Sequence, residues 1–265
     1  MKPARIPRFS PKSLFWLVLI TPLILADAVQ GQDISVRQRL GSMQGFLTLR
    51  DQAGAILAAG DLTQVPYGDR IKLRTVFHFR DGSIDDETTI FSQEKVFRLI
   101  TDRHVQKGPS FPHPCDITIN MPSQQVTIRD LSKANDAPRI EHMDLPPDLA
   151  NGVIFFLIMN LPPDAPKIEF PYLSPSLKPR MVKLAVAADG KEPFKLSGLR
   201  YQALKYDVKV DITGVAGVVA PVIGKQPPDS HVWVTDGSAP TLIRIDTSLY
   251  EEGPVWSIRL ASPVW

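Results

Sequence analysis

Apolar and polar residues alternate one by one along much of the chain. In Ile71–Arg80 the two kinds trade places at almost every position, a pattern typical of a β-strand with one buried and one solvated face. The further strands that we predict are Phe46–Arg50, Thr88–Phe91, Val96–Thr101, Asp116–Asn120, Gln125–Arg129, Met181–Ala187, Leu199–Asp211, His231–Val234, Thr241–Ile245 and Trp256–Leu260. Strands that follow one another through short connections predict a mainly β fold, an antiparallel meander.

Three Asp-Gly pairs stand between strand-like runs, at Asp81-Gly82, Asp189-Gly190 and Asp236-Gly237. This pair suits tight turns, because glycine readily adopts the positive φ that such turns need. We therefore expect a β-hairpin at each of them. The polar stretch Ser132–Pro147 lacks a strand pattern and is expected to be a loop.

One segment breaks the alternation. Pro146–Asn160 follows Asp144, the expected N-cap, and becomes apolar on every side from Val153 onward. It predicts a short helix that is buried on most of its surface. At roughly 13 residues this helix would reach only about 20 Å, too little to cross a bilayer. The fold class that we expect is a curved sheet or half-barrel around one short apolar helix.

The N-terminus has the three parts of a secretory signal. Four basic residues precede the apolar run Ser13–Leu25, and small residues follow at Ala26 and Ala28. This order predicts a signal peptide, residues 1–28, that is cleaved after Ala28. An uncleaved membrane anchor is the alternative, although a spanning helix needs about 20 apolar residues. We expect residues 29–265 to be one β-rich domain, periplasmic or secreted, that does not span the membrane.

The basic character of the chain comes from that N-terminal segment. The whole sequence has 30 Lys and Arg and 28 Asp and Glu, whereas residues 29–265 have 26 and 27, a net charge of −1. Nucleic-acid binding needs a clustered cationic face, so no nucleic acid is expected as a partner. The single cysteine, Cys115, cannot form an internal disulfide, and the fold must therefore rest on its apolar core.

The most reactive-looking stretch is His113-Pro114-Cys115-Asp116. A cysteine nucleophile needs a base positioned across the fold, and zinc takes three or four ligands at a recognisable spacing. Neither pattern is present, so we interpret the stretch as a loop leading into a strand, with Cys115 as a small buried side chain. A hydrolase or metal enzyme that uses His113, Asp116 or another histidine is the less favoured alternative. No catalytic residue, metal ligand or cofactor is predicted.

Other ionisable residues are interpreted as solvated. The acidic run Asp85–Glu87 follows an expected turn and is read as a loop face. The remaining histidines stand one to a segment and are expected to face solvent: His78, His104, His142 and His231.

Large apolar side chains form the candidate ligand site. They are Phe155, Phe156 and Met159 on the predicted helix, with Tyr201, Trp233 and Trp256 on late strands. Ligand sites are concave and mostly apolar, so we predict an apolar cleft between the helix and the sheet. A filled core would use the same residues and is the alternative.

Several late motifs resemble those of uncharacterised exported bacterial proteins of the acidobacterial type. They are Leu196–Tyr206, Ala220–Asp229, His231–Val234 and Glu252–Trp256, together with Pro146–Gly152 at the start of the predicted helix. Such proteins are similar in layout to the lipoprotein-localisation group. That resemblance implies an incomplete antiparallel barrel that folds around helices and holds acyl chains, and it implies no catalytic residues.

These observations lead to two functional hypotheses. The first is a non-enzymatic envelope protein that binds or carries a hydrophobic, lipid-like molecule. The second is an envelope scaffold or assembly factor that pairs with a protein partner through an exposed sheet edge, because an open sheet leaves backbone donors and acceptors unpaired.

Overall fold

The alternating pattern folds into strands along nearly the whole of the part that can be described. The computed structural model describes residues 33–135, 137–196, 199–211, 227–237 and 239–261, so the predicted signal peptide lies outside the described residues. The elements are β1 (Met43–Arg50), β2 (Ile56–Tyr67), β3 (Arg70–Phe79), β4 (Ile84–Gln93), β5 (Phe97–Lys107), β6 (Cys115–Asn120), β7 (Gln125–Asp130), β8 (Arg139–His142), α1 (Ile154–Asn160), β9 (Ile168–Leu173), β10 (Met181–Leu196), β11 (Leu199–Asp211), β12 (Ser230–Thr235), β13 (Leu242–Thr247) and β14 (Trp256–Ala261).

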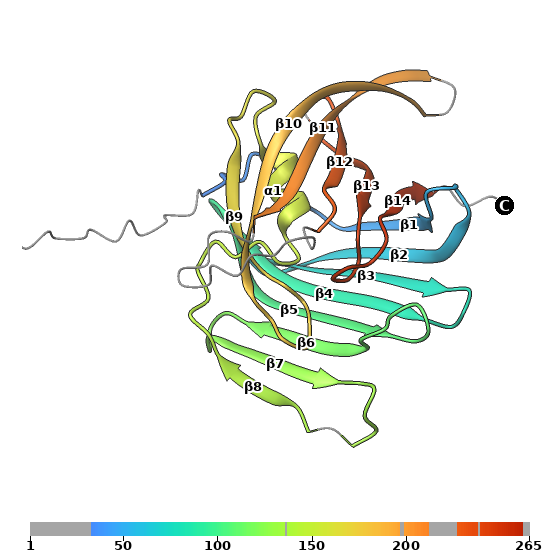
Figure 1. Cartoon of the computed structure of the whole chain (residues 1–265). Coiled ribbons are helices and arrows are strands. Elements are labelled where there is room, and N and C mark those ends of the chain that lie inside the picture. Colours follow the sequence, from blue (N-terminus) through green and yellow to red (C-terminus); the bar gives the residue numbers. More distant parts are fainter. Residues whose placement is uncertain (1–32, 136, 197–198, 212–226, 238, 262–265) are drawn as a thin grey trace, which may run out of the picture. The chain divides into compact units, whose positions relative to one another are not determined.

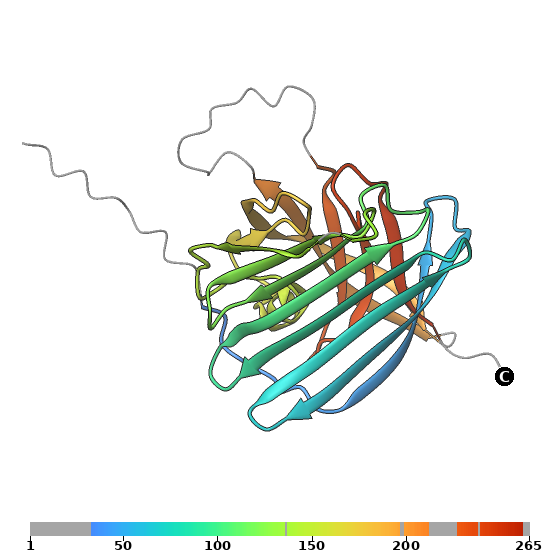
Figure 2. The same cartoon turned by 90° about the horizontal axis from the view of Figure 1, so that it is seen from below.

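All of these strands belong to one antiparallel sheet. Its order is β8-β7-β6-β5-β4-β3-β2-β1-β14-β13-β12-β11-β10-β9, so strands that are neighbours in sequence lie side by side, except for β8 and β9. β1 pairs with β14, with Phe46 opposite Ala261, and β8 and β9 form the two edges. Figures 1 and 2 show the sheet curving strongly, with α1 on its concave side. The predicted fold class, a mainly β antiparallel meander with one short helix, is confirmed.

The concave side holds the apolar core. The larger cluster joins residues of both halves of the sheet, for example Leu49 of β1, Phe91 of β4 and Tyr206 of β11, to the buried side chains of α1. A smaller cluster joins β6 and β7 to Leu173 of β9 through Leu145 and Leu149. The helix therefore packs between the two halves, as expected for a helix without a polar face.

The helix is shorter than the sequence predicted. It begins after Val153, which makes no side-chain cap hydrogen bond, and Asp144 is not its N-cap. Gly152 has a φ of +64°, a conformation that an α-helix cannot include. The side chain of Asn151 is held by the backbone of Leu173, accepting from its N–H at 2.8 Å and donating to its C=O at 2.8 Å. The residues before Val153 thus bind the edge of β9 and are not part of α1.

That contact covers one of the two sheet edges. Besides the two bonds of Asn151, the Ala150 N–H donates to the Pro171 carbonyl at 2.9 Å. Leu173 and Pro171, the two residues that these bonds reach, lie on β9, whose only strand neighbour in the described sheet is β10. Covering an edge strand in this way satisfies backbone groups that would otherwise pair with another chain.

Two of the three predicted Asp-Gly hairpins are confirmed. Asp81-Gly82 joins β3 to β4, and Asp236-Gly237 lies between the paired strands β12 and β13. Asp189-Gly190 instead lies inside β10, where the register against β11 shifts between Ala188 and Lys191. The positive φ of Gly190, +88°, forms a β-bulge there rather than a turn.

The sequence analysis did not identify three strands. β2 contains Gly60 and Pro66 and so has a weak strand pattern, yet Gly60 is needed, since a Cβ there would lie 2.6 Å from the ring of Phe77. β9 contains Pro171, and β8 lies within the predicted loop Ser132–Pro147, whose interpretation as a loop throughout was wrong. Proline is tolerated at an edge, which is where β9 lies.

Candidate functional site

The structure places the six predicted ligand-binding residues on two different faces. Four of them belong to or pack against the larger core cluster: Phe155, Phe156, Met159 and Trp256. The ring of Phe156 lies 5.2 Å from that of Phe91, and the ring of Trp256 lies 5.6 Å from that of Phe79.

Trp233 lies on the opposite face of the sheet. Its neighbours Val232 and Val234 point into the larger core cluster, so Trp233 between them points away. There its indole N–H donates to the Glu192 carboxylate at 2.9 Å, and the Arg244 guanidinium stacks 4.5 Å from the ring centre.

Tyr201 shares that outer face and is 44% exposed. Its ring stacks on Phe194 at 5.5 Å, two residues beyond Ala203, where the pairing of β11 with β12 ends. The structure therefore does not bring Tyr201 and Trp233 together with the helix.

A group of polar side chains lies where the concave face was expected to be apolar. Three cross-strand pairs follow one another on β4 and β5: Asp85 opposite Gln106, Glu87 opposite His104, and Thr89 opposite Asp102. On the next strand, β3, Phe77 is opposite Asp85 and Leu73 is opposite Thr89, and both belong to the core. We call these six polar residues the inner polar cluster.

Hydrogen bonds tie most of this cluster together. Asp85 Oδ2 lies 3.0 Å from His104 Nε2 and accepts from Gln106 Nε2 at 2.6 Å. Gln106 Nε2 also donates to the Leu249 carbonyl at 2.7 Å. The Thr89 hydroxyl donates to Asp102 Oδ1 at 2.8 Å. Glu87 lies between Asp85 and Thr89 on the same face of β4, directly opposite His104.

The electrostatic environment changes the protonation of the cluster. Burial, followed by the charges of Asp102 and Asp85, raises the pKa of Glu87 to about 8. Burial also raises the pKa of Asp102 to about 6, against the hydrogen bond from Thr89. Burial opposes the charge on His104, but the attraction of Asp85, Glu87 and Asp102 outweighs it and raises that pKa to about 10. Near pH 7 His104 is therefore protonated beside Asp85, and the interacting carboxyl groups of Glu87 and Asp102 hold protons more tightly than ordinary carboxyl groups do.

Two other elements approach this cluster. Burial and the charges of Glu87, Asp102 and Asp85 raise the pKa of Tyr172 on β9. A Cβ on Gly152, just before α1, would lie 2.1 Å from Thr89 Oγ1. The start of the helix thus rests directly on the polar cluster, so the cluster and α1 form one site.

The sequence analysis missed this cluster, and its interpretation of the residues was wrong. Asp85 and Glu87 do not lie on a solvated loop but on the inner face of β4, and His104 does not face solvent; His78 and His142 are exposed, as predicted. A bulge in β5 explains the error for His104. Ile90 is opposite Thr101 and Phe91 is opposite Leu99, so one extra residue reverses the alternation after Leu99.

The stretch that looked most reactive in sequence has a structural role. Cys115 is 2% exposed and begins β6, as predicted for a loop leading into a strand. Burial raises the pKa of its thiol to about 11, which keeps it uncharged and a poor nucleophile at neutral pH. Within the described part of the chain, no group of three or more histidine, cysteine or acidic side chains has an arrangement that could hold a metal ion.

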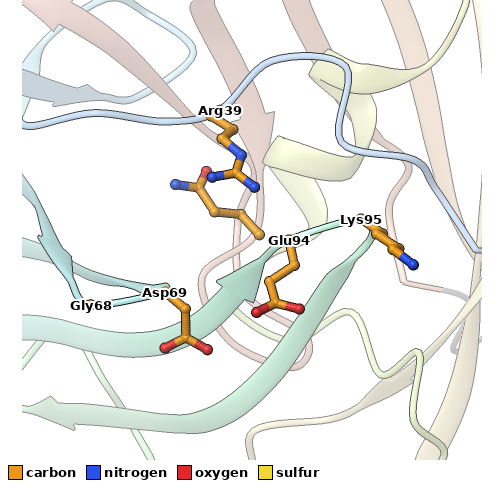
Figure 3. A pocket seen from close by; sticks show the side chains of 6 residues that line it. Arg39, Gly68, Asp69, Glu94 and Lys95 are labelled. Atoms are coloured by element: carbon orange, nitrogen blue, oxygen red, sulfur yellow. The ribbon is translucent and has the colours of Figure 1, made fainter.

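A separate polar hollow of about 300 Å³ lies at the tips of two hairpins. Figure 3 shows the residues that line it: Arg39 of the N-terminal segment, Gly68 and Asp69 of the β2–β3 turn, and Glu94 and Lys95 of the β4–β5 turn. Gln93 fixes this junction, because its amide accepts from the Leu40 N–H at 2.6 Å and donates to the Leu40 carbonyl at 2.9 Å. We interpret the hollow as the place where the N-terminal segment is attached to the sheet.

The chain was compared with known proteins. No protein-family model matches the chain, and no curated protein matches it significantly. One solved structure is similar, that of a β-barrel-like protein of the domain of unknown function DUF1849 from Brucella abortus. Its TM-score is 0.45 at 10% sequence identity, and the match covers 86% of this chain and 99% of the other. Among the residues that the structure describes, no helix has the length and apolarity needed to cross a membrane.

Proposed function

We propose that the protein binds a lipid-like amphiphile in the bacterial envelope, with the apolar chain of the ligand against α1 and its polar head at the inner polar cluster. The observation that carries this proposal is a group of ionisable side chains with shifted pKa values on the face that also holds the apolar core. Mostly apolar sites with a few converging polar groups are typical of ligand binding, and strongly perturbed pKa values are common at functional sites.

The helix supplies the apolar part of the proposed site. Phe155 and Met159 are four residues apart, so they lie on the same side of α1, and both are only half-buried, whereas Ile154, Phe156 and Ile158 are buried. This side is the part of the helix that an acyl chain can contact without displacing the core.

The inner polar cluster supplies the head-group part. Such a cluster gives little stability, because the cost of removing charges from water offsets their attraction. Because the carboxyl groups of Glu87 and Asp102 hold protons more tightly than usual, they can both donate and accept hydrogen bonds. The cluster also has three carboxyl groups and only one imidazole. We therefore expect a head group that donates hydrogen bonds, such as an ammonium, to bind better than a carboxylate.

The test begins with what the protein carries from the cell. The full chain is expressed in a bacterium, the exported form is purified without detergent, and native mass spectrometry followed by solvent extraction looks for bound amphiphile. Binding of hexadecylammonium and hexadecanoate is then measured by calorimetry. We expect the ammonium to bind at least about tenfold more tightly, a difference of about 1.4 kcal/mol.

Matched variants make this test specific. Met159→Gln keeps the size of a half-buried side chain and should weaken both probes, whereas Trp233→Phe, on the outer face, should weaken neither. A protein that carries no amphiphile and binds neither probe would contradict the proposal, and so would equal losses in the two variants.

One observation favours the alternative of a protein partner. The other sheet edge, β8, is short and exposes Ile140 to 58%, and an uncovered edge can accept a strand from another protein. A photo-crosslinking residue at position 140 should then form one defined adduct in intact cells. As a control, the photo-crosslinking residue is placed at position 72 instead of the exposed Lys72 on β3. If both positions give the same crosslinked products, the hypothesis of a protein partner at β8 is wrong.

A further inference from the structure

The β10–β11 hairpin extends beyond the rest of the sheet. β10 pairs with β9 only over Met181–Val186, and β11 pairs with β12 only over Ala203–Val208. The outer part of the hairpin continues as a two-stranded ribbon, in which Phe194 is opposite Tyr201 and Lys195 is opposite Arg200. Figure 1 shows this ribbon curving away past β12. We call Phe194–Lys195 and Leu199–Tyr201 the arm.

The base of the arm is fixed, whereas its outer part has few contacts. Lys191 Nζ lies 2.5 Å from Asp236 Oδ2, and Glu192 accepts the hydrogen bond of the Trp233 indole. Beyond these residues Leu199 is 62% and Tyr201 44% exposed. A two-stranded ribbon is at best marginally stable alone in water, so an exposed ribbon with apolar side chains indicates a surface that it contacts.

The two faces of the arm differ in chemistry. Directly opposed residues share a face, so Phe194, Tyr201 and Leu199 form an apolar face, and Lys195 and Arg200 form a basic one. The aromatic rings stack at 5.5 Å. In the part of the chain that the structure describes, neither Lys195 nor Arg200 has a carboxylate within ion-pair distance.

The basic pair points to an anionic contact. Like charges directly opposite each other on two strands are destabilising, and here no acidic side chain relieves the repulsion. An anionic partner would relieve it. Aromatic side chains next to lysine and arginine are typical of protein segments that lie in the head-group region of a membrane.

We propose that the arm docks the protein on an anionic lipid bilayer, with Phe194, Leu199 and Tyr201 in the head-group region and Lys195 and Arg200 against lipid phosphates. This inference goes beyond the proposed function and does not depend on it, because it concerns the outer part of the β10–β11 hairpin and requires no ligand at α1. It also gives Tyr201, which the structure separates from the helix, a role of its own.

Vesicle flotation tests the arm. The exported form of the full chain is mixed with vesicles of phosphatidylcholine, with or without phosphatidylglycerol, and the bound fraction is measured as a function of salt. We expect binding to the anionic vesicles only, weakened by salt. Each basic residue near an anionic surface contributes on the order of 1 kcal/mol, so Lys195→Gln with Arg200→Gln should lower the partition coefficient about 30-fold.

The control removes the same charge elsewhere. Lys72 and Lys107 are exposed on β3 and β5, and their double change to glutamine should leave binding and the melting temperature unchanged. Phe194→Ser with Tyr201→Ser should also reduce binding, without the change in net charge. The proposal is overturned if the wild type binds no vesicles, if it binds neutral and anionic vesicles equally, or if the control pair loses as much binding as the arm pair.

Discussion

The carboxyl group of Glu87 lies on a face of β4 whose next members are Thr89 and the fully buried Phe91. At this position the chain carries an acid where alternation alone would favour an apolar residue. The same holds for Asp85 and Asp102, which are 4% and 2% exposed. Their effect on stability depends on pH, because the folded and unfolded chains bind protons differently.

We predict that Glu87→Gln stabilises the protein progressively as pH rises. The pKa of Glu87 is raised from 4.5 to about 8, so the folded chain retains a proton that the unfolded chain has already lost. Wild-type stability therefore decreases as pH rises between these two values. The variant lacks this loss, and its advantage should grow from near zero at about pH 4.5 to several kcal/mol, on the order of 5 kcal/mol at most, above pH 8. Urea unfolding at several pH values measures it.

Asp86 provides the matched control on the same strand. The Asp86 side chain points to the other face of β4. There the Arg74 guanidinium donates two hydrogen bonds to the Asp86 carboxylate, at 2.9 and 2.7 Å, and these lower the pKa of Asp86. Its contribution is fully present above its ordinary pKa of 3.8, so Asp86→Asn should cost a constant amount, up to about 1 kcal/mol, across the same range. If the change in the free energy of unfolding depended on pH in the same way for both variants, the pKa of Glu87 would not be raised in the folded protein.

At the scale of elements, the start of α1 is determined by close contact rather than by capping. Gly152 combines a φ of +64° with a direct approach to Thr89, and Asn151 beside it holds the edge of β9. Proline and apolar residues in Pro146–Asn160 were enough to predict a buried helix. They could not predict where it begins, because that depends on two strands distant in sequence.

We predict that Gly152→Ala destabilises the protein far more than a change at a free glycine. The new Cβ would have to displace Thr89, and the alanine would also have to adopt a left-handed backbone conformation. We expect the free energy of unfolding to fall by about 3 kcal/mol. Gly54→Ala is the control, since Gly54 has a φ of +88° but nothing within 4 Å of a Cβ, and should cost only about 1 kcal/mol. Thermal unfolding compares them, and equal costs would mean that the helix start does not press on β4.

The strands show which parts of the sheet the alternation of apolar and polar residues can predict. β3 and β7 follow the alternation and were located from it, because each has one face in the core and one in solvent. β5 follows it only as far as Leu99. The bulge then moves Asp102 and His104 to the inner face, and a single extra residue in a strand leaves no distinct mark in the sequence. The β5 members of the inner polar cluster were missed for this reason, whereas Asp85 and Glu87 were missed because the acidic run was read as a loop.

At the scale of the whole molecule, the sheet is open but its two edges are linked. The Arg139 guanidinium of β8 donates to the Leu177 carbonyl, beyond β9, at 2.8 Å. Beneath that bond, Leu149 packs in the smaller core cluster with Val126 of β7 and Leu173 of β9. Strand pairing does not join these edges, so side chains from the segment between β8 and α1 hold the halves together. We call this junction between β8 and β9, which Leu145 and Leu149 fill, the seam. A ligand that approaches α1 between these two edges has to pass the seam.

This arrangement predicts that Leu149→Ala opens the seam before the rest of the sheet. Leu149 is 1% exposed, and removing a buried leucine side chain costs about 2–5 kcal/mol. Because no strand hydrogen bonds cross the seam, the loss should appear as local opening, with faster amide exchange in β7 and β9 than in β1–β3. Leu49→Ala near the end of β1, a strand in the middle of the sheet where Leu49 is 0% exposed, should speed exchange in all strands alike. If both variants gave the same uniform pattern, the two halves would open only together with the whole sheet, and a ligand could not enter through the seam alone.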